Sequence, residues 1–372
     1  MLLFRKRGIV FFGGYPFAAR EKDGYFQRVA AIDQVFSDML RVYIDFSPCP
    51  GQPYGPWMQR PTSSTLVLNY YGTVRRKLLV MFCVTIFALR YRRVYFHSVF
   101  GLCREHSWLL QVPGMIAVID VHGVVPEEFR YSNDFCSAVI MERLEEFAVR
   151  HAKGIVVVTK AMGRYLQGKY RERLRGMLLE YPILPPMPDM PWRQEECARP
   201  LVVYAGGVQK WQLTPLMAKI MVEQRDLCRY AIYTPSPEEF AALLPPQFRG
   251  CPTFDLDSKN HDDLLEIYPF CHYGFILRDE SIVNQVACPT KLVEYLAMGI
   301  VPIVNSPSIG DFEEFGMRYI TLEDFANGRL PDEKIRRSMA EENLAIYRRI
   351  QETSIHGMKT LRDMLFPQDP RR

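Results

Sequence analysis

Two charged residues that are three positions apart, Lys291 and Glu294, lie near the start of a predicted helix within Arg278–Val304. Residues at this spacing share one face of a helix. Pro289 suits the first turn and Gly299 the end of such a helix. Its unpaired N–H groups would favour a diphosphate, and a carboxylate one turn in could hold the hydroxyls of a ribose. The spacing alone is more typical of an amphipathic helix with two solvated charges.

Two glycine pairs follow apolar runs that are predicted to be strands, where ligands bind to parallel sheets. They are Gly13 with Gly14, and Gly206 with Gly207. Glycine lets a loop approach a ligand closely. Lys210 follows the second pair and could form charge-assisted bonds to phosphate, each about 1.5–3 kcal/mol. The alternative is a surface turn with a solvated lysine.

Three segments resemble GT-B glycosyltransferases, the retaining, nucleotide-sugar-dependent enzymes of the group 1 or family 4 type, which include makers of bacterial surface polysaccharides. The segments are PTKLVEYLAMGIVPIV at Pro289–Val304, YAGGVQKWQ at Tyr204–Gln212 and DVHGVVPEE at Asp120–Glu128. They lie in both halves of the chain, in the order of the family. The resemblance implies an α/β GT-B fold, with two Rossmann-like, doubly wound domains facing a cleft.

The resemblance also implies roles for individual residues. Glu294 corresponds to the glutamate that binds the ribose hydroxyls of the donor, and Lys210, Arg278 and Lys291 are candidates for the diphosphate. The candidate catalytic residues are His122, Lys210 and Glu280. The candidate donor-binding residues are Gly13, Gly14, Gly207, Lys210, Arg278, Ser281, Asn284, Thr290, Lys291 and Glu294.

The chain departs from the family at the sugar side of the donor. Most members carry a second glutamate upstream of the ribose-binding one, and Val286 occupies that position here. Glu280, Ser281 and Asn284 lie in the same loop and could face the donor sugar. Whether Glu280 or Asn284 replaces the missing glutamate stays open.

His122 lies, by the resemblance, near the donor sugar and the leaving group, although a lone histidine is more often structural. Glu127 and Glu128 follow it closely, and a carboxylate pair could perform acid–base chemistry. Retaining enzymes of this fold show no agreed carboxylate nucleophile, so we interpret the pair as loop or helix-start residues. His97, after another predicted strand, is a weaker candidate.

Strand and helix patterns alternate along the chain, which predicts parallel sheets wrapped by helices. Tyr181–Trp192, YPILPPMPDMPW, contains five prolines and indicates a stiff linker. We therefore predict an acceptor-side domain over 1–185 and a nucleotide-sugar-binding domain over 186–345. The resemblance implies that a last helix over 346–372 crosses back onto the first domain.

Composition narrows the class of protein. A chain of 372 residues favours two domains, and a net charge of +4 is too small to indicate nucleic-acid binding. Cys83, Cys136 and Cys271 lie in apolar runs, as reduced core cysteines of a cytosolic protein do. We see no signal peptide, and we predict no metal requirement because the DLD at 255–257 lies away from the expected donor phosphates.

The longest apolar run, Leu78–Leu89, has twelve residues, fewer than the roughly 20 that cross a bilayer. Basic residues flank it on both sides within Arg75–Arg93. The favoured interpretation is a buried core helix with solvated ends. The alternative is a helix on an anionic membrane surface, which would place a cytoplasmic protein at the inner face of the cytoplasmic membrane.

The predicted function is that of a retaining glycosyltransferase that takes its sugar from a UDP- or GDP-sugar and needs no separate cofactor. The acceptor is a glycan or a lipid-linked molecule. One alternative is a nucleotide-sugar 2-epimerase of the same fold. Another is an inactive nucleotide-sugar-binding module, to which Val286 lends support.

Overall fold

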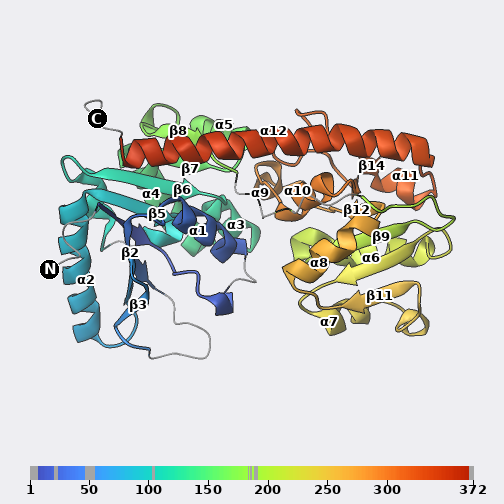
Figure 1. Ribbon diagram of the computed structural model, residues 1–372, viewed down its shortest axis with the longest axis horizontal. Coiled ribbons are helices and arrows are strands. Elements are labelled where there is room, and N and C mark those ends of the chain that lie inside the picture. Colours follow the sequence, from blue (N-terminus) through green and yellow to red (C-terminus); the bar gives the residue numbers. More distant parts are fainter. Residues whose placement is uncertain are drawn as a thin grey trace. The chain divides into compact units, whose positions relative to one another are not determined.

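The computed structural model describes residues 7–20, 24–46, 55–102, 105–182, 184, 187 and 192–367, without the side chains of Ala19 and Lys210. The chain divides into two compact units (Figure 1). Unit 1 comprises Met1–Ile183 and Thr353–Arg372, and unit 2 comprises Leu184–Glu352. Most of the predicted proline-rich linker lies outside the described residues.

Unit 1 is built on a sheet whose described strands run in the order β3-β4-β2-β1-β5-β6-β7-β8. Every neighbouring pair is parallel except β3 with β4. The central strands are fully buried, because helices cover both faces of a parallel sheet. The strands are β1 (Gly8–Phe12), β2 (Leu40–Asp45), β3 (Met58–Thr62), β4 (Thr65–Asn69), β5 (Arg93–His97), β6 (Ile116–Val121), β7 (Gly154–Val157) and β8 (Met177–Glu180).

The helices of unit 1 connect these strands. Val29 and Ile32 of the first helix pack against Phe11 of β1 and against Leu361 and Leu365 near the end of the chain. The helices are α1 (Gly24–Val35), α2 (Val74–Tyr91), α3 (Val125–Tyr131), α4 (Phe135–His151) and α5 (Lys160–Tyr170). Short 3-10 turns are η2 (Ala18–Arg20), η3 (Val99–Gly101), η4 (Ser107–Gln111) and η5 (Arg171–Arg173).

Unit 2 contains a parallel sheet in the order β11-β10-β9-β12-β13-β14. Its strands are β9 (Leu201–Ala205), β10 (Arg229–Tyr233), β11 (Phe254–Asp257), β12 (Tyr273–Phe275), β13 (Val301–Val304) and β14 (Ile320–Thr321). Its helices are α6 (Thr214–Glu223), α7 (Pro237–Leu243), α8 (His261–Ile267), α9 (Ile282–Gln285), α10 (Thr290–Ala297) and α11 (Leu322–Ala326), with 3-10 turns η6 (Lys210–Gln212), η7 (Pro246–Phe248) and η8 (Tyr268–Phe270).

The last helix, α12 (Glu333–Leu365), begins in unit 2 and ends in unit 1. In unit 2, Arg336 is buried and donates to Gln194 at 3.1 Å. In unit 1, Arg362 pairs with Asp38 at 2.6 Å. A Cβ on Gly357 would lie 2.5 Å from the Glu180 carbonyl oxygen, so the helix can approach β8 this closely only with glycine there.

Both sheets have the strand order of a Rossmann fold, in which the order reverses beside the first strand of the unit. The reversal lies between β1 and β5 in unit 1 and between β9 and β12 in unit 2. The predicted architecture of two Rossmann-like units is therefore confirmed. In such sheets, ligands bind beyond the carboxyl ends of the strands at the reversal.

Three local predictions are wrong. The proline- and glycine-rich stretch SPCPGQPYGPWMQRP, residues 47–61, predicts a loop. Met58–Thr62, which overlaps the end of that stretch, instead pairs with β4 as an antiparallel edge strand, where its proline is tolerated. Cys136 is exposed rather than buried, although Cys271 is buried. The predicted core helix Leu78–Leu89 is the middle of α2, which buries only one face. The hydrophobic sequence around Cys136 and within Leu78–Leu89 indicated burial. Whether a side chain is buried depends on the atoms that folding brings against it.

Candidate functional site

The candidate residues of unit 2 gather where the strand order reverses. Gly206 and Gly207 follow β9, and Arg278 comes shortly after β12, the neighbouring strand. Helix α10 is held at the same end of the sheet, because the backbone N–H of Ala205 donates to the Tyr295 hydroxyl at 3.2 Å. A glycine turn, a basic loop and a helix N-terminus therefore meet at one edge.

Helix α10 begins and ends close to its predicted bounds. Pro289 is the residue before the helix rather than its first residue. Gly299 has φ +68°, and a Cβ there would lie 2.5 Å from the Trp192 ring. The Trp192 indole N–H also donates to the Ala297 carbonyl at the helix end, at 3.3 Å. These contacts fix the orientation of the face that carries Lys291 and Glu294.

Lys291 points into the site rather than into solvent. Its ammonium donates to the Gln212 side-chain oxygen at 3.0 Å and lies 5.0 Å from the centre of the Tyr204 ring. It forms no ion pair with any carboxylate in the described part of the chain. Burial, together with the nearby Arg278, lowers the pKa of Lys291 to about 7. A cation without a direct ion-pair partner among the described residues is poised to receive an anion.

Gly206 makes room for this ammonium. A Cβ at Gly206 would lie 1.8 Å from the Lys291 Nζ atom and 3.0 Å from the Gln212 side-chain oxygen. The glycine that follows β9 is therefore required by Lys291 as well as by the turn.

Gly206→Ala should displace the Lys291 ammonium and weaken the binding of a nucleoside diphosphate by roughly tenfold, the loss of about one charge-assisted hydrogen bond. Isothermal titration of the variant against the wild-type protein measures this loss. Gly168→Ala, in helix α5, where an added Cβ meets nothing within 4 Å, is the control for a general effect of alanine. Unchanged binding in Gly206→Ala would contradict this placement of Lys291.

Glu294 lies one turn into α10 and is 4% exposed. The Tyr268 hydroxyl donates to its carboxylate at 3.1 Å, and His261 Nδ1 lies 3.6 Å from the other oxygen. Burial raises the pKa of Glu294 to about 7, although Tyr268 and Lys291 oppose the rise. The predicted alternative of two solvated charges on this helix is therefore wrong. A buried carboxylate with spare acceptor capacity suits a pair of hydroxyl donors.

The loop after β12 is ordered by its own hydrogen bonds. Arg278 donates to the Asn284 side-chain oxygen at 3.2 Å, and the amide of Asn284 donates to the Asp279 carbonyl at 3.0 Å. The Ser281 hydroxyl donates to the Asp279 carboxylate at 2.9 Å. Asn284 is buried, so it holds the loop and orients the guanidinium of Arg278. Burial lowers the pKa of Arg278, which nevertheless stays a cation.

A polar pocket of about 220 Å³ opens beside this loop. Glu280 is exposed at its rim. Val286 is 2% exposed and lies in the protein interior, so a glutamate at that position would lose its solvation. The pocket is lined by Arg278, Asp279, Glu280, Gln285, Ser306, Ser308 and Ile309.

No side-chain contact in the described part of the chain assigns a role to three further candidate residues, Lys210, Gly207 and Thr290. The backbone of Lys210 begins η6, but its side chain lies outside the described part of the structure. Gly207 accepts a hydrogen bond from the Tyr204 hydroxyl through its carbonyl. Thr290 is the first residue of α10 and is partly buried.

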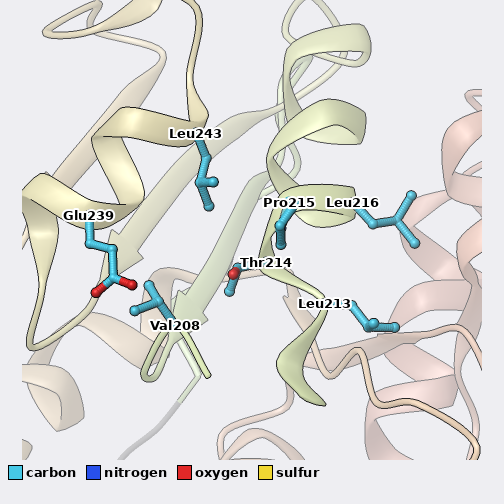
Figure 2. Close-up of a pocket in the computed structure, with 7 residues that line it drawn as sticks. All are labelled: Val208, Leu213, Thr214, Pro215, Leu216, Glu239 and Leu243. Carbon is cyan, nitrogen blue, oxygen red and sulfur yellow. The ribbon is translucent and has the colours of Figure 1, made fainter. Parts of the chain in front are cut away.

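A second pocket, of about 520 Å³, lies on the other side of the glycine turn (Figure 2). Figure 2 shows the Glu239 carboxylate of α7 beside Val208, and Leu243 of the same helix directed toward Thr214. None of the described side chains that line it is basic, so this pocket suits a diphosphate less well than the polar pocket does. It is lined by Val208, Leu213, Thr214, Pro215, Leu216, Glu239 and Leu243.

In unit 1, the glycines after β1 also lie at a reversal of strand order, but protein side chains occupy the space over them. A Cβ on Gly13 would lie 2.8 Å from the Cβ of His97 and 2.9 Å from the Tyr25 hydroxyl. A Cβ on Gly14 would lie 2.7 Å from the Phe26 ring. Glycine is needed here for packing in the ligand-free chain.

His122 follows β6 and remains accessible, with a fifth of its side chain exposed. Its Nδ1 lies 3.8 Å from the Asp120 carboxylate, and its ring centre lies 5.5 Å from that of Tyr25. Burial alone would raise the pKa of Asp120, but Arg28 and His122 hold it well below its usual range. Arg28 donates to that carboxylate at 2.8 Å. A permanent anion therefore lies beside the imidazole, at a distance longer than a hydrogen bond.

Two further titratable groups lie near His122. His97 is fully buried, and burial lowers its pKa to about 3, so it stays neutral. Glu128 approaches the backbone beside His122, since a Cβ on Gly123 would lie 2.5 Å from its carboxylate. Burial raises the pKa of Glu128, and His122 opposes the rise. Glu127, by contrast, is tied to Lys169 at 2.8 Å and is structural.

Sequence reasoning missed several residues of these clusters. Gln212, Tyr268 and His261 contact the two charged residues of α10, and Arg28 fixes Asp120. Each comes from a different element. Gln212 ends the quoted segment Tyr204–Gln212, where no role was predicted for it, and the other three lie outside the quoted segments. No group of three or more His, Cys, Asp or Glu side chains in the described ranges could hold a metal ion.

Neither a protein-family model nor a curated protein sequence matches the chain. Solved structures do. The sucrose-phosphate synthase of Thermosynechococcus elongatus is 10% identical, with a TM-score of 0.69, over 97% of this chain and 99% of that one. The Anabaena protein HepE in complex with UDP-glucose is 12% identical, with a TM-score of 0.64, over 95% and 99%.

A third similar structure is the α,α-trehalose-phosphate synthase (UDP-forming) of Burkholderia vietnamiensis. It is 13% identical, with a TM-score of 0.63, over 97% of each chain. These neighbours are GT-B glycosyltransferases. At such identities the likeness shows the fold, so the chain has the GT-B fold and the predicted fold class is confirmed.

Proposed function

We propose that the chain is a retaining glycosyltransferase that takes a sugar from a nucleoside-diphosphate sugar. The observation that carries this proposal is the pair on α10. Lys291 holds a half-buried ammonium without an ion-pair partner in the described residues, and Glu294 holds a buried carboxylate one turn further on. The first suits a diphosphate and the second a ribose diol.

The proposed chemistry is charge stabilisation of the leaving group. As the bond to the sugar breaks, negative charge grows on the nucleoside diphosphate. Lys291, Arg278 and the N-terminus of α10 stabilise that charge, with Lys210 as a further candidate. The donor of HepE in its solved complex is UDP-glucose. We propose a UDP-sugar before a GDP-sugar on that likeness.

His122, Lys210 and Glu280 remain the proposed catalytic residues, on the strength of the family resemblance. The Asp120 carboxylate lies 3.8 Å from His122 Nδ1, and the accessible ring can donate or accept a hydrogen bond. Glu280 is exposed at the rim of the polar pocket, where a sugar hydroxyl could reach it. Gly13 and Gly14 would shape the loop beside His122, not bind the nucleotide directly.

The proposed acceptor is a glycan or a lipid-linked molecule. A lipid-linked acceptor would place the chain at the inner face of the cytoplasmic membrane as a peripheral protein. None of the helices in the described ranges is long and apolar enough to cross a bilayer.

The test is a screen of nucleoside-diphosphate sugars by thermal stabilisation, followed by analysis of products with the donor that binds. A ligand at 100 times its Kd should add about 2.7 kcal/mol of stability. Transfer of the sugar to an acceptor or to water, with retained configuration, supports the proposal. An epimerised donor would indicate the 2-epimerase, and tight binding without any product would indicate a binding module.

Removal of divalent metal ions should leave the activity unchanged. Lysine, arginine and a helix N-terminus meet the phosphate charge in this proposal, so no metal ion is needed there. The assay compares turnover with excess EDTA and with added Mg²⁺ or Mn²⁺. Activity that EDTA abolishes and either ion restores would overturn this prediction.

A further inference from the structure

The face of α2 that points away from the sheet is apolar along most of its length. Large apolar residues recur there every four positions and are exposed. Their exposed fractions are 73% for Val74, 61% for Leu78, 65% for Phe82 and 41% for Ile86. Leu79 and Leu89 lie on the flanks of this stripe and are also exposed, while the opposite face is buried. These six residues are called the α2 stripe.

The buried face fixes the helix firmly to unit 1. Val80, Val84 and Ala88 have no exposed surface, and Tyr91 packs over Gly8. The helix is capped at its start, where the Thr73 hydroxyl accepts from the backbone N–H of Arg76 at 3.4 Å. The α2 stripe is therefore a rigid part of the fold, and no described segment of the chain covers it.

The charged residues of α2 itself are all basic. The helix contains no acidic residue, and exposed Arg75 and Lys77 lie at its start, with exposed Arg90 and Arg92 at its end. Arg76 differs, because its guanidinium donates to the Asn69 carbonyl at 3.2 Å and holds the helix start. An apolar stripe between cationic ends complements a surface that is apolar below a layer of anionic groups.

Trp57 lies beside the strand that leads into α2. Its carbonyl accepts from the backbone N–H of Asn69, the last residue of β4, shortly before α2 begins. More than a third of Trp57 and of the neighbouring Met58 is exposed. Tryptophan with an exposed ring is typical of the membrane–water boundary.

We propose that α2 docks the chain onto a bilayer that contains anionic lipid, with the α2 stripe at the level of the acyl chains. The exposed basic residues at both ends would contact the lipid phosphates. With 18 residues, the helix lies in the interface and does not cross it. A second copy of the chain would bring like charges together at both ends, so the lipid surface is the better match.

The docking helix begins at the edge of the sheet that carries His122. Strand β4 leads into α2, and strand β6 leads into His122. Between them, β4 pairs with β2, β2 with β1, β1 with β5 and β5 with β6, and every one of these pairs is parallel. The carboxyl ends of these strands therefore lie at one edge of unit 1. This part of the inference rests on the proposed function, since it selects a lipid-linked acceptor over a soluble glycan.

Sedimentation with vesicles tests the docking surface without any donor or acceptor. Vesicles of phosphatidylcholine alone are compared with vesicles in which one lipid in three is phosphatidylglycerol. The wild-type chain should bind the anionic vesicles, and salt should weaken the binding because it screens the basic ends. Equal binding to both vesicles, or to neither, overturns the proposal.

Paired variants locate the surface. Leu78→Gln with Phe82→Gln removes the apolar contact, and Arg75→Gln with Lys77→Gln removes charge. Each pair should lower vesicle affinity by roughly tenfold or more, without a change in circular dichroism. The matched control, Phe135→Gln with Ile140→Gln on α4, alters exposed apolar residues of the same unit and should leave the affinity unchanged.

Two outcomes would assign the surface differently and overturn the proposal. One is an equal loss of vesicle binding in the α4 control. The other is a wild-type dimer on gel filtration that Phe82→Gln dissociates. Failure of the proposed function is a separate result, because a chain that transfers no sugar would still bind vesicles. If transfer occurs, Phe82→Gln should slow transfer only to an acceptor embedded in vesicles.

Discussion

Glu294→Gln should lower the affinity for a nucleoside-diphosphate sugar about 100-fold, because an amide replaces a carboxylate that accepts two hydroxyl donors. The amide oxygen can still accept from the Tyr268 hydroxyl, which now donates to the carboxylate at 3.1 Å. The ligand-free fold should therefore survive the change. Donor-induced thermal stabilisation should nearly vanish while the ligand-free protein still melts cooperatively.

The ligand-free melting temperature of Glu294→Gln has its own pH dependence. Burial raises the folded-state pKa of Glu294 from 4.5 to about 7. A raised pKa contributes stability at low pH that is lost as the pH rises toward 7. The melting temperature of the variant should consequently equal that of the wild type at pH 4 and exceed it at pH 8. A lower melting temperature at both pH values would indicate a purely structural role.

Glu239→Gln is the matched control for this experiment, because Glu239 is exposed and lines the apolar pocket of Figure 2. It should leave both donor affinity and melting temperature unchanged. If Glu239→Gln lost the donor and Glu294→Gln kept it, the nucleotide site would lie in the apolar pocket instead.

Lys291→Met should weaken donor binding by about 100-fold and at the same time stabilise the ligand-free chain. The Lys291 side chain is half-buried and forms no ion pair with a described carboxylate, so folding carries part of the cost of removing its charge from water. Methionine fills a similar volume without charge. Near pH 7 the gain should be about 2 kcal/mol, which raises the melting temperature by about 4–8 °C.

The pH dependence of this gain follows from the pKa of Lys291, which burial lowers from 10.5 to about 7. A lysine with a depressed pKa loses folded-state stability as the pH falls from 10.5 to 7. The advantage of Lys291→Met should therefore be small at pH 10 and full below pH 7. Lys219→Met, at an exposed lysine of α6, should show neither effect.

Together the two residues predict an optimum for donor binding near pH 7. Lys291 must carry its proton to meet a phosphate, and Glu294 must lose its proton to accept from the ribose. Lys291→Arg keeps the charge at every accessible pH, so it should remove only the decline above pH 7. Titration calorimetry of a nucleoside diphosphate across pH 5.5–9 measures the profile. A flat wild-type profile would contradict the assignment of both groups.

The periodicity of apolar residues was sufficient to predict the alternation of strands and helices in both halves of the chain. The alternation of buried strands and helices is a local property, since a strand covered on both faces must be apolar and a helix covered on one face must be periodic. The α10 segment is the best case, because its spacing and the glycine at 299 locate the helix, and the resemblance attaches a role to Glu294. Edge strand β3 escaped this reasoning because its exposed, proline-containing sequence resembles a loop.

The sequence by itself determined which residues share a face, namely Lys291 and Glu294 on one helix and the basic ends of α2 on another. Only the tertiary structure decided whether those faces are exposed to solvent or buried. Gln212 accepts from Lys291, Tyr268 donates to Glu294, and the missing Cβ at Gly206 leaves room for the Lys291 ammonium. Phe82, by contrast, lies in the predicted core helix and is exposed. The reason is physical. Periodicity comes from neighbours in the chain, but solvation comes from atoms brought close by folding, and solvation sets both the pKa of a charge and the partner of an apolar face.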